Sequence, residues 1–306
     1  MDTRVGIIGT GMIGSAVAKR LLNSGCKVVV YNRTQKKTQP LATLGATICK
    51  TPKEVAKSSE LIITIVKDAG AVRDVAFGKD GIVEGYHEGL TVADMSTINP
   101  FESKDIAKKF QENKIEMLEI PVMGGPKFAE DGKLLMMIGG NKAVYEKYKA
   151  IFDRIAEKSF YLGQNGTALA IKLAMNLQIS LVALAVSEGI TLTKGAGLDP
   201  QAFLQILNST YFKTGLSENK GPKMIKGDFT ATFTIDNMKK DLDIIKEAAK
   251  AFNISLPMAT LADNLYQDAI RNGFAQLDYS GILAYIEKIS KETKTYDLSK
   301  YVKLDQ

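Results

Sequence analysis

The first half of the chain alternates short β-rich runs with helix-like stretches, and this alternation restricts the possible folds more than any other feature. Strands are expected at residues 5–8, 27–31, 61–66, 91–93, 115–120 and 134–138, and helices at 12–24, 51–58, 69–77, 100–113 and 143–157. Apolar strands that alternate with helices are typical of βαβ units around a parallel sheet. The sequence therefore predicts an α/β fold with a doubly wound, Rossmann-type parallel sheet.

The second half of the chain has a different pattern. A last strand-like run at 159–162 is followed by a break at residues 163–166 (GQNG), and the pattern is helical from there on. Helix-start and break signals follow at Asp199-Pro200 and Gly221-Pro222. A chain of 306 residues can form two cores. We expect an α/β domain over 1–163 and an all-α domain over 164–306, with a peripheral charged tail from Lys288.

A glycine-rich loop joins the first expected strand to the first expected helix. Gly9, Gly11 and Gly14 have the spacing G-x-G-x-x-G. Such glycines permit a tight turn, a close approach of the backbone to a pyrophosphate and close helix–strand packing, while the helix N-terminus faces the negative charge. In this βαβ context the loop predicts dinucleotide binding, by residues Gly9, Gly11, Met12, Ile13 and Gly14.

The end of the second expected strand indicates which dinucleotide is bound. NAD-binding proteins usually place a carboxylate there for the ribose 2′-hydroxyl, whereas this chain has Asn32, Arg33 and Thr34. Arg33 can stack on adenine and bind a 2′-phosphate, with Asn32 and Thr34 adding hydrogen bonds. The alternative is a solvated basic loop. We expect NADP(H) as the cofactor, with NAD as a weaker alternative.

Lys172 and Asn176 lie four residues apart in the almost wholly apolar segment 166–194. Four residues are about one helical turn, so both side chains share one face. The other polar members of the same stripe are Ser180, Ser187, Thr191 and Lys194. A buried ammonium group is costly, so a lysine placed there is expected to be paired or to have a pKa lowered for proton transfer. The alternative is a lysine whose stem lies on apolar surface while its head reaches water.

Composition and charge argue against several classes of function. The net charge is +6, but basic and acidic residues are interspersed, which does not indicate a nucleic-acid-binding protein. His87 is the only histidine, so a His-based catalytic site or a multi-His metal site is not expected, and the residue is expected to face solvent in a loop. Cys26 and Cys49 lack CxxC spacing and indicate reduced structural thiols.

The ends and the apolar segments of the chain bear on its location. Residues 1–4 lead directly into the first expected strand, which argues against a signal peptide. We find no stretch of about 18 residues as free of polar groups as a membrane span requires. A cytoplasmic protein without membrane partners is therefore expected. The nearly all-round apolar helix at 168–192 could be buried between subunits, so at least a dimer is expected.

Four further motifs follow the glycine loop in a fixed order. They are residues 94–100 (DMSTINP), residues 121–126 (PVMGGP), the segment 163–176 that ends in Lys172 and Asn176, and Phe233 with Lys240-Asp241. Over residues 4–290 this set closely resembles the β-hydroxyacid dehydrogenase family. Its members include 3-hydroxyisobutyrate dehydrogenase, tartronate semialdehyde reductase and the glyoxylate/succinic semialdehyde reductases. The runs at 129–134 and 158–163 look most like the last branch.

The resemblance implies roles for individual residues. Lys172 matches the catalytic lysine, which acts as general acid/base, and Asn176 matches its partner. The positions that match the substrate site are Ser96, Thr97, Met123, Gly124, Gly125, Phe233 and Asp241. Lys240 matches a lysine beside the cofactor, where Val66, Lys67 and Thr97 are also expected. The implied activity is NADP(H)-dependent interconversion of a short hydroxy acid and its semialdehyde or oxo acid, by a homodimer or homotetramer.

Two residues depart from the family pattern. Met123 stands where the family usually has a serine that donates to the substrate, and a thioether cannot donate. This favours weaker binding of small acids or a larger, less polar substrate. Lys67 stands where the family commonly has proline, and solvent exposure is its simplest role.

Two other functions are compatible with the same architecture. Imine reductases share the fold but generally lack the catalytic lysine, so Lys172 argues against that activity. A non-catalytic NADP-binding interaction module would lose the lysine or the substrate motif. Lys172, Asn176, Ser96 and Thr97 are all present, which favours an enzyme, whereas Met123 leaves the second alternative open.

Overall fold

The structure is a computed structural model that describes residues 3–290. The chain divides into two compact units, Met1–Leu173 and Ala174–Gln306. Most of the tail that was expected to be peripheral lies outside the described residues.

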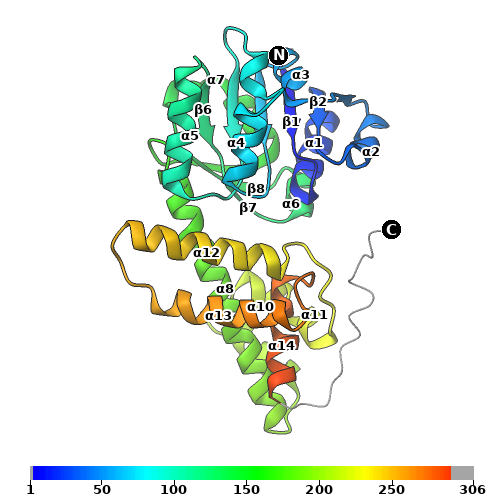
Figure 1. Ribbon diagram of the computed structural model, residues 1–306. Helices are drawn as coiled ribbons and strands as arrows, with labels where there is room; N and C mark the ends of the chain where they lie inside the picture. The colour runs from blue at the N-terminus through cyan, green and yellow to red at the C-terminus, as the bar shows by residue number, and fades with distance from the viewer. Residues whose placement is uncertain (1–2, 291–306) are drawn as a thin grey trace. The chain divides into compact units, whose positions relative to one another are not determined.

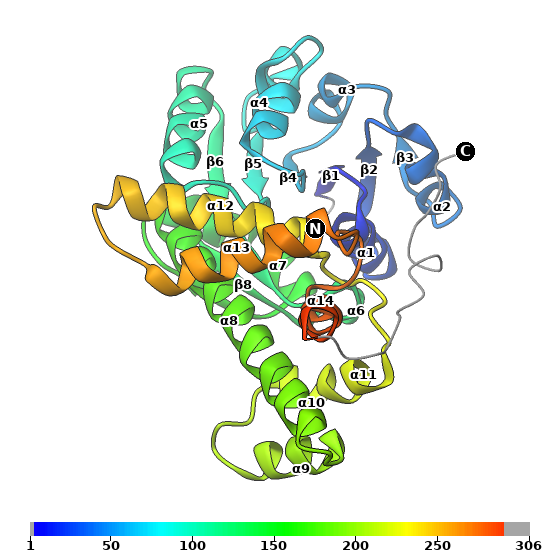
Figure 2. The same ribbon diagram turned by 60° about the horizontal axis from the view of Figure 1, so that its bottom comes forward.

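The first unit contains six parallel strands (Figure 1), and their order is β3-β2-β1-β4-β5-β6, as the labels of Figure 2 show. They are β1 (Arg4–Ile8), β2 (Lys27–Tyr31), β3 (Thr47–Ile48), β4 (Leu61–Thr64), β5 (Thr91–Asp94) and β6 (Glu116–Glu119). The chain builds outward from β1 to β3, then returns to place β4 beside β1, where Val5 pairs with both Val28 and Leu61. This order confirms the predicted doubly wound Rossmann sheet.

Helices cover both faces of this sheet. One core joins α1 (Met12–Asn23) and α7 (Lys142–Ile155) to strand residues such as Val5 and Ile7. The other joins α3 (Pro52–Lys57), α4 (Ala69–Phe77) and α5 (Pro100–Glu112) to residues such as Ile8 and Ile62. Successive side chains of a strand point to opposite faces, so a strand buried on both faces must be apolar throughout. This explains the continuous apolar runs in the sequence.

A small mixed sheet extends the first unit. It contains β7 (Val122–Met123), β8 (Leu134–Ile138) and β9 (Ala156–Tyr161), with β7 antiparallel and β9 parallel to β8. Helix α6 (Pro126–Asp131) lies between β7 and β8 in the chain. The remaining short elements are η1 (Gln35–Thr38), α2 (Gln39–Ala42) and η2 (Ile82–Gly85).

In the first unit, the elements that the sequence pattern did not predict are short. Strands β3 and β7 have two residues each, and α2 and α6 have four and six, which is too short to show a periodic pattern. The helix expected to reach residue 157 ends at Ile155, where β9 begins at once. Residues 156 and 157, which the sequence pattern places in the helix, therefore belong to β9, which pairs with β8.

The second unit is helical, as predicted. Its elements are α8 (Thr167–Gly195), which begins in the first unit, then α9 (Pro200–Ser209), α10 (Gly215–Asn219), α11 (Gly221–Lys226), α12 (Ile235–Ala251), α13 (Pro257–Arg271), η3 (Tyr279–Gly281) and α14 (Ile282–Ile289). Helices α12 and α13 run side by side (Figure 2). The Asp199 side chain accepts from Gln201 N, as expected for a helix start, and Gly221 also begins a helix.

Helix α8 is long and apolar enough to cross a membrane by length and composition, with a mean hydropathy of 1.9 in its most apolar window. Only 39% of that window is buried in the protein. The expected polar stripe is nevertheless turned inward: Lys172, Asn176, Ser180 and Ser187 are all buried. Further along the stripe, Lys194 forms an ion pair with the fully buried Glu287. The helix therefore has a buried polar face and an exposed apolar one.

The first turn of α8 is held by a carboxylate of the first unit. Glu119 is fully buried and accepts from Gly166 N at 2.7 Å, Ala168 N at 2.8 Å and Ser103 Oγ at 2.8 Å. Leu169 N lies 3.3 Å from the same carboxylate. The first N–H groups of a helix have no partner within it, and their partial positive charge favours an anion. Glu119 therefore fixes the turn that precedes Lys172.

We predict that Glu119→Ala destabilises the first unit strongly. The change leaves buried N–H and O–H donors without an acceptor, and each lost bond to a charged group costs about 1.5–3 kcal/mol. Because such losses are not additive, we expect a total of about 3 kcal/mol in urea unfolding. Glu116→Ala, at an exposed position of the same strand, is the matched control. Equal midpoints for the two variants would contradict this role.

Candidate active site

The glycine loop follows β1 and leads into α1, as predicted. The structural reason for a glycine differs from one position of the loop to the next. Gly9 has φ +100°, and a Cβ there would lie 2.0 Å from Ile65 O. A Cβ at Gly14 would lie 2.0 Å from Gly9 O. At Gly11, by contrast, a Cβ would meet no atom of the described chain within 4 Å. Two glycines are thus required by packing, whereas Gly11 borders open space at the helix N-terminus.

The loop after β2 is tied to the glycine loop through Asn32. Its Oδ1 accepts from Thr10 N at 3.0 Å, and its Nδ2 donates to Thr34 O at 3.0 Å. Arg33 is exposed beside it, and Met12 is 45% exposed at the start of α1. Thr10 Oγ1 is buried and has no hydrogen-bond partner among residues 3–290. The open space at Gly11, the helix N-terminus and this hydroxyl fit a bound dinucleotide phosphate.

The ends of β4 and β5 carry the next predicted residues. Val66 N donates to Ser96 Oγ at 3.0 Å, and Ser96 Oγ lies 2.7 Å from Asp94 Oδ1. Thr97 is half-buried and Lys67 is exposed, as expected. The carboxyl end of β4 lies beside that of β1, so Gly9 and Val66 are brought together. This is the point where the strand order reverses and where sheets of this type bind ligands.

Asp94 was part of a recognised motif but was given no role. It is 1% exposed, and burial raises the pKa of its carboxyl to about 6 although Thr64 and Ser96 donate to it. The sequence signal was a carboxylate that ends an apolar strand and is followed by two hydroxyl residues. Buried carboxylates with a shifted pKa are common where side chains are positioned for function.

Lys172 lies beside the loop formed by β7 and α6. It is 9% exposed, and its Nζ is 3.2 Å from the Sδ of Met123. Gly124 follows with φ +121°, and a Cβ there would lie 2.9 Å from Leu134 Cδ2, so only glycine fits without strain. Gly125 is the extended residue before α6. The first unit thus brings together Lys172, Met123 and the two glycines.

The second unit brings together Asn176, Lys240 and Asp241. Asn176 Nδ2 donates to Asp241 Oδ2 at 2.5 Å, and both residues are buried. Lys240 Nζ is 2.7 Å from Asp241 Oδ1. The sequence placed Asn176 beside Lys172 on one turn of α8, but it could not show that Asp241, 65 residues later, holds the amide.

Phe233 lies on the loop that precedes α12 and is held by residues that the sequence analysis did not single out. Tyr279 N donates to Phe233 O at 2.8 Å, and the two rings pack edge to face. Asp278 is buried and accepts from Lys220 Nζ at 2.5 Å and Thr232 N at 2.9 Å. The Lys220 ammonium holds the pKa of the Asp278 carboxyl below its usual value. The only signal in the sequence was an Asp-x-Ser helix start.

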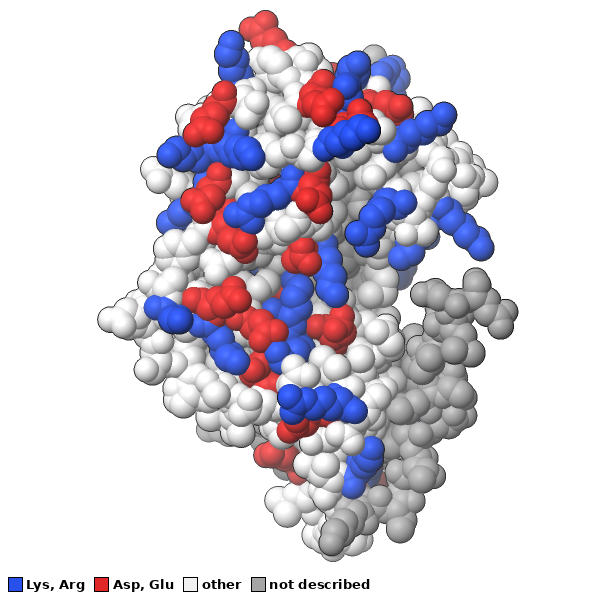
Figure 3. Space-filling model, in the orientation of Figure 1, with Lys and Arg blue, Asp and Glu red and all other residues white. Residues whose placement is uncertain are grey.

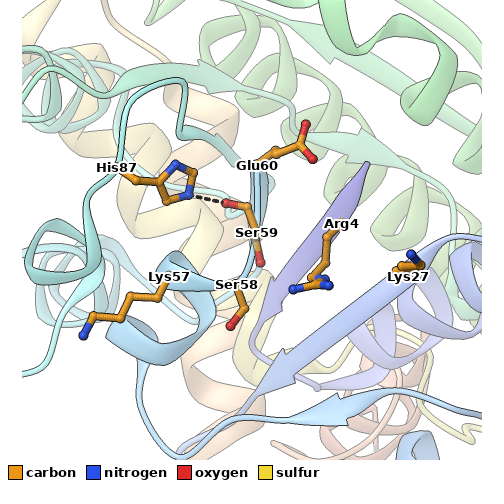
Figure 4. A pocket seen from close by; sticks show the side chains of 7 residues that line it. All are labelled: Arg4, Lys27, Lys57, Ser58, Ser59, Glu60 and His87. Atoms are coloured by element: carbon orange, nitrogen blue, oxygen red, sulfur yellow. Dashed lines mark hydrogen bonds between the residues drawn. The ribbon is translucent and has the colours of Figure 1, made fainter. Parts of the chain in front are cut away.

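A hollow lies at the opposite, amino end of the strands (Figure 4). It is lined by Arg4, Lys27, Lys57, Ser58, Ser59, Glu60 and His87. The expectation that His87 faces solvent from a loop holds only in part. The ring is half-buried, and its Nε2 lies 2.8 Å from Ser59 O and 3.2 Å from Ala56 O, where backbone carbonyls at the end of α3 bind it. Ligands of parallel sheets bind at the carboxyl ends, so the candidate site remains at the glycine loop.

Charge does not single out another site on the face that Figure 3 shows. Basic and acidic side chains alternate over it, without a large area of one sign. Among the described residues, no group of three or more His, Cys, Asp or Glu side chains could hold a metal ion.

Two family models match the chain, one over each part of it. The family model for the NAD binding domain of 6-phosphogluconate dehydrogenase matches residues 4–163. The model for the NAD-binding domain of NADP-dependent 3-hydroxyisobutyrate dehydrogenase matches residues 166–286.

Relatives and solved structures match over almost the whole chain. Glyoxylate/succinic semialdehyde reductases 1 and 2 of Arabidopsis thaliana are each 33% identical, over 94% and 91% of this chain and 99% and 78% of their own length. The crystal structure of 3-hydroxyisobutyrate dehydrogenase from Salmonella typhimurium has a TM-score of 0.85 at 26% identity, covering 93% of this chain and 100% of that one.

We predict that the glycines of the loop separate into two classes. Gly14→Ala should lower the free energy of unfolding by about 1–3 kcal/mol or more, because its Cβ would overlap a carbonyl oxygen. Gly11→Ala should change it by less than about 0.5 kcal/mol, because the space is open. Its methyl group would occupy the approach to the pyrophosphate, so the Kd for NADPH should rise at least about tenfold.

Urea unfolding and fluorescence titration with NADPH measure the two effects on the same samples. Gly25→Ala is a control for the effect of backbone strain on NADPH affinity, because Gly25 has a positive φ but lies at the distant end of α1. The Kd for NADPH should not change in this variant. Unchanged NADPH affinity in Gly11→Ala would contradict the assignment of this loop.

Proposed function

Because the chain belongs to the β-hydroxyacid dehydrogenase family of 3-hydroxyisobutyrate dehydrogenase and its relatives, we propose that it interconverts a short hydroxy acid and its semialdehyde or oxo acid with NADP(H). The observation that carries the proposal is Lys172, buried on α8 one turn before Asn176. The candidate substrates are 3-hydroxyisobutyrate, 4-hydroxybutyrate with succinic semialdehyde, and glyoxylate. The names of the Arabidopsis relatives support the last two.

Lys172 is the proposed general acid/base. The bound nicotinamide supplies or takes the hydride. During reduction the Lys172 ammonium gives a proton to the carbonyl oxygen, and during oxidation the amine takes it from the hydroxyl. The side chain is buried, and its Nζ lies 3.2 Å from Met123 Sδ in the loop proposed to bind the substrate. Asn176, fixed by Asp241, is the proposed partner on the next turn.

The proposed carboxylate site is the loop after β7. The backbone amides of Gly124 and Gly125 can donate to an acid group, whereas Met123 cannot. A methionine packs well against a carbon chain. We therefore favour a substrate with a chain, such as succinic semialdehyde, over glyoxylate. The resemblance assigns Phe233 and Asp241 to closing the pocket, and Lys240 to the cofactor.

A panel of substrates tests the proposal directly. Steady-state kcat/KM should be measured for glyoxylate, malonic semialdehyde and succinic semialdehyde, each with NADPH and with NADH. Cyclic imines should be included, because imine reductases share the architecture. Binding of NADPH without its oxidation by any aldehyde would favour the non-catalytic NADP-binding module. Activity on imines alone would favour an imine reductase.

We predict that Lys172→Met abolishes turnover without loss of cofactor binding. Removing a general acid/base costs about 10²–10⁴-fold in kcat. Methionine keeps the length and apolar volume of the lysine stem, so the Kd for NADPH should stay within about threefold. Lys108→Met, at an exposed position of α5, controls for loss of a charge. A Lys172→Met enzyme with kcat within about threefold of the parent would exclude this role.

We also propose that Arg33 gives the preference for NADP(H) over NAD(H). It is exposed beside Asn32, at the end of β2 where a carboxylate would select NAD. A charge-assisted hydrogen bond is worth about 1.5–3 kcal/mol, so Arg33→Ala should raise the KM for NADPH about tenfold or more. The KM for NADH should change by less than about threefold.

The matched control for Arg33 is Lys36→Ala, which removes one exposed charge from the following turn. Equal effects of Arg33→Ala on both cofactors would remove Arg33 as the discriminating residue. An equal effect of Lys36→Ala on NADPH would point instead to the general positive charge of the loop.

We propose a homodimer or homotetramer. Helix α8 combines a mean hydropathy of 1.9 with only 39% burial of its most apolar window, and Ile171, Met175 and Leu192 on it are 47%, 41% and 76% exposed. A second copy of the chain can cover this apolar face. Sedimentation velocity at micromolar concentration tests this, and a monomer would contradict it.

The proposed location is the cytoplasm. The stripe of α8 that contains Lys172, Asn176, Ser180 and Ser187 is buried in protein, as in a core helix rather than a membrane span. Cell fractionation tests the proposal, and recovery in the membrane pellet after a high-salt wash would contradict it.

A further inference from the structure

The hydroxyl group of Ser96 is engaged by two hydrogen bonds within the first unit. Its Oγ accepts from Val66 N at 3.0 Å and lies 2.7 Å from Asp94 Oδ1. An ionised carboxylate only accepts hydrogen bonds, so the one hydroxyl hydrogen of Ser96 points to Asp94. The remaining lone pair of Ser96 could only repel a substrate carboxylate. Ser96 is therefore unsuited to donate to the acid group of a substrate.

Asp94 also connects the ends of two strands. Thr64 is the last residue of β4 and Asp94 the last of β5, and the two are paired in register. Thr64 Oγ1 donates to Asp94 Oδ1 at 2.6 Å, and Ser96 N lies 3.3 Å from the same oxygen. The other oxygen, Oδ2, has no hydrogen-bond partner among residues 3–290. All the recorded donors thus converge on the oxygen that binds Ser96.

We propose that Asp94 is a positioning residue that takes the hydroxyl hydrogen of Ser96 and thereby leaves the Ser96 oxygen to hold Val66 N–H. This chain of contacts fixes the loop after β4 against the loop after β5. Ser96 is then a structural hydroxyl, and a substrate acid group has to be bound by other donors. The consequence for ligands rests on the proposed function, whereas the hydrogen-bond arrangement does not depend on it.

The prediction concerns the backbone amide of Val66 in the cofactor-free protein. Ser96→Ala removes the acceptor of this amide, and Asp94→Ala removes the group that orients it. Each should speed hydrogen exchange of Val66 at least about tenfold, which corresponds to about 1.4 kcal/mol. The double variant should exchange no faster than the faster single variant, because both changes break one chain of contacts.

Thr64→Val is the matched control. It has nearly the same shape and removes a different donor from the same oxygen of Asp94, without touching the link to Val66. Exchange at Val66 should stay within about twofold of the parent, whatever the change in global stability. Equal acceleration in Thr64→Val would show that stability alone controls the amide, and the proposal would be wrong. Parental exchange in Asp94→Ala would overturn it as well.

Asp94→Asn provides a second variant if Asp94→Ala does not fold. A neutral amide oxygen accepts about half as strongly as a carboxylate, so exchange at Val66 should still rise several-fold. An unchanged rate would overturn the proposal.

A ligand readout separates this inference from the proposed function. The Kd for NADPH should rise in Asp94→Ala and Ser96→Ala but not in Thr64→Val. If exchange responds as predicted while no variant or parent oxidises NADPH with any aldehyde, the positioning role stands and the proposed function fails. If the parent is active but exchange at Val66 does not respond, the proposed function stands and the positioning role of Asp94 fails.

Discussion

The contact on which the candidate site depends most is the buried carboxylate of Glu119 at the first turn of α8. Glu119 is the last residue of β6, and its carboxylate oxygens accept from Gly166 N and Ala168 N. These hydrogen bonds join the end of the strand to the start of the long helix. Lys172 lies one turn further along that helix. A lysine on a frayed turn would be a solvated cation, whereas Lys172 on this fixed turn is buried beside Met123. The proposed proton-transfer chemistry follows from that restraint.

The carboxyl edge of the parallel sheet arranges the rest of the first unit. Because β4 returns to the side of β1, the loop after β4 meets the glycine loop, and Gly9 has no room for a side chain beside Ile65 O. Asn32 ties in the loop after β2 through Thr10 N, and Asp94 ties in the loop after β5 through Ser96. Hydrogen bonds between neighbouring loops thus hold the carboxyl edge of the sheet, where the cofactor is expected to bind. The buried apolar strands stabilise the fold of the unit.

Two buried carboxylates of the same unit illustrate how burial and hydrogen bonding compete. Burial raises the pKa of Asp94 to about 6 and raises the pKa of Glu119 in spite of the backbone donors that face it. Each ionised group is costly in a protein interior unless donors surround it. In the described residues both groups hold backbone segments in place, which explains how a costly charge serves the architecture.

The sequence by itself determined the two-part architecture, the positions of the main elements of the first unit and the place of helix α8. Apolar strands buried on both faces, the G-x-G-x-x-G turn and the 3.6-residue period of α8 are local patterns, and local patterns can be recognised without a structure. The sequence also placed Lys172 and Asn176 on one face of one helix. It could not predict β3, β7 or β9 exactly, because two-residue strands and a strand directly after a helix are decided by pairing with distant partners.

Only the tertiary structure decided which polar groups meet. Asn176 with Asp241, Phe233 with Tyr279, and Glu119 with Ala168 are each separated by 46 residues or more, and no sequence period relates them. The same holds for His87, whose ring lies against the carbonyl oxygens of Ala56 and Ser59. The sequence assigned a hydroxyl role to Ser96, but the direction of its single hydrogen depends on Asp94 and Val66. Hydrogen bonds are directional and short-ranged, so their partners become known only when the chain has folded.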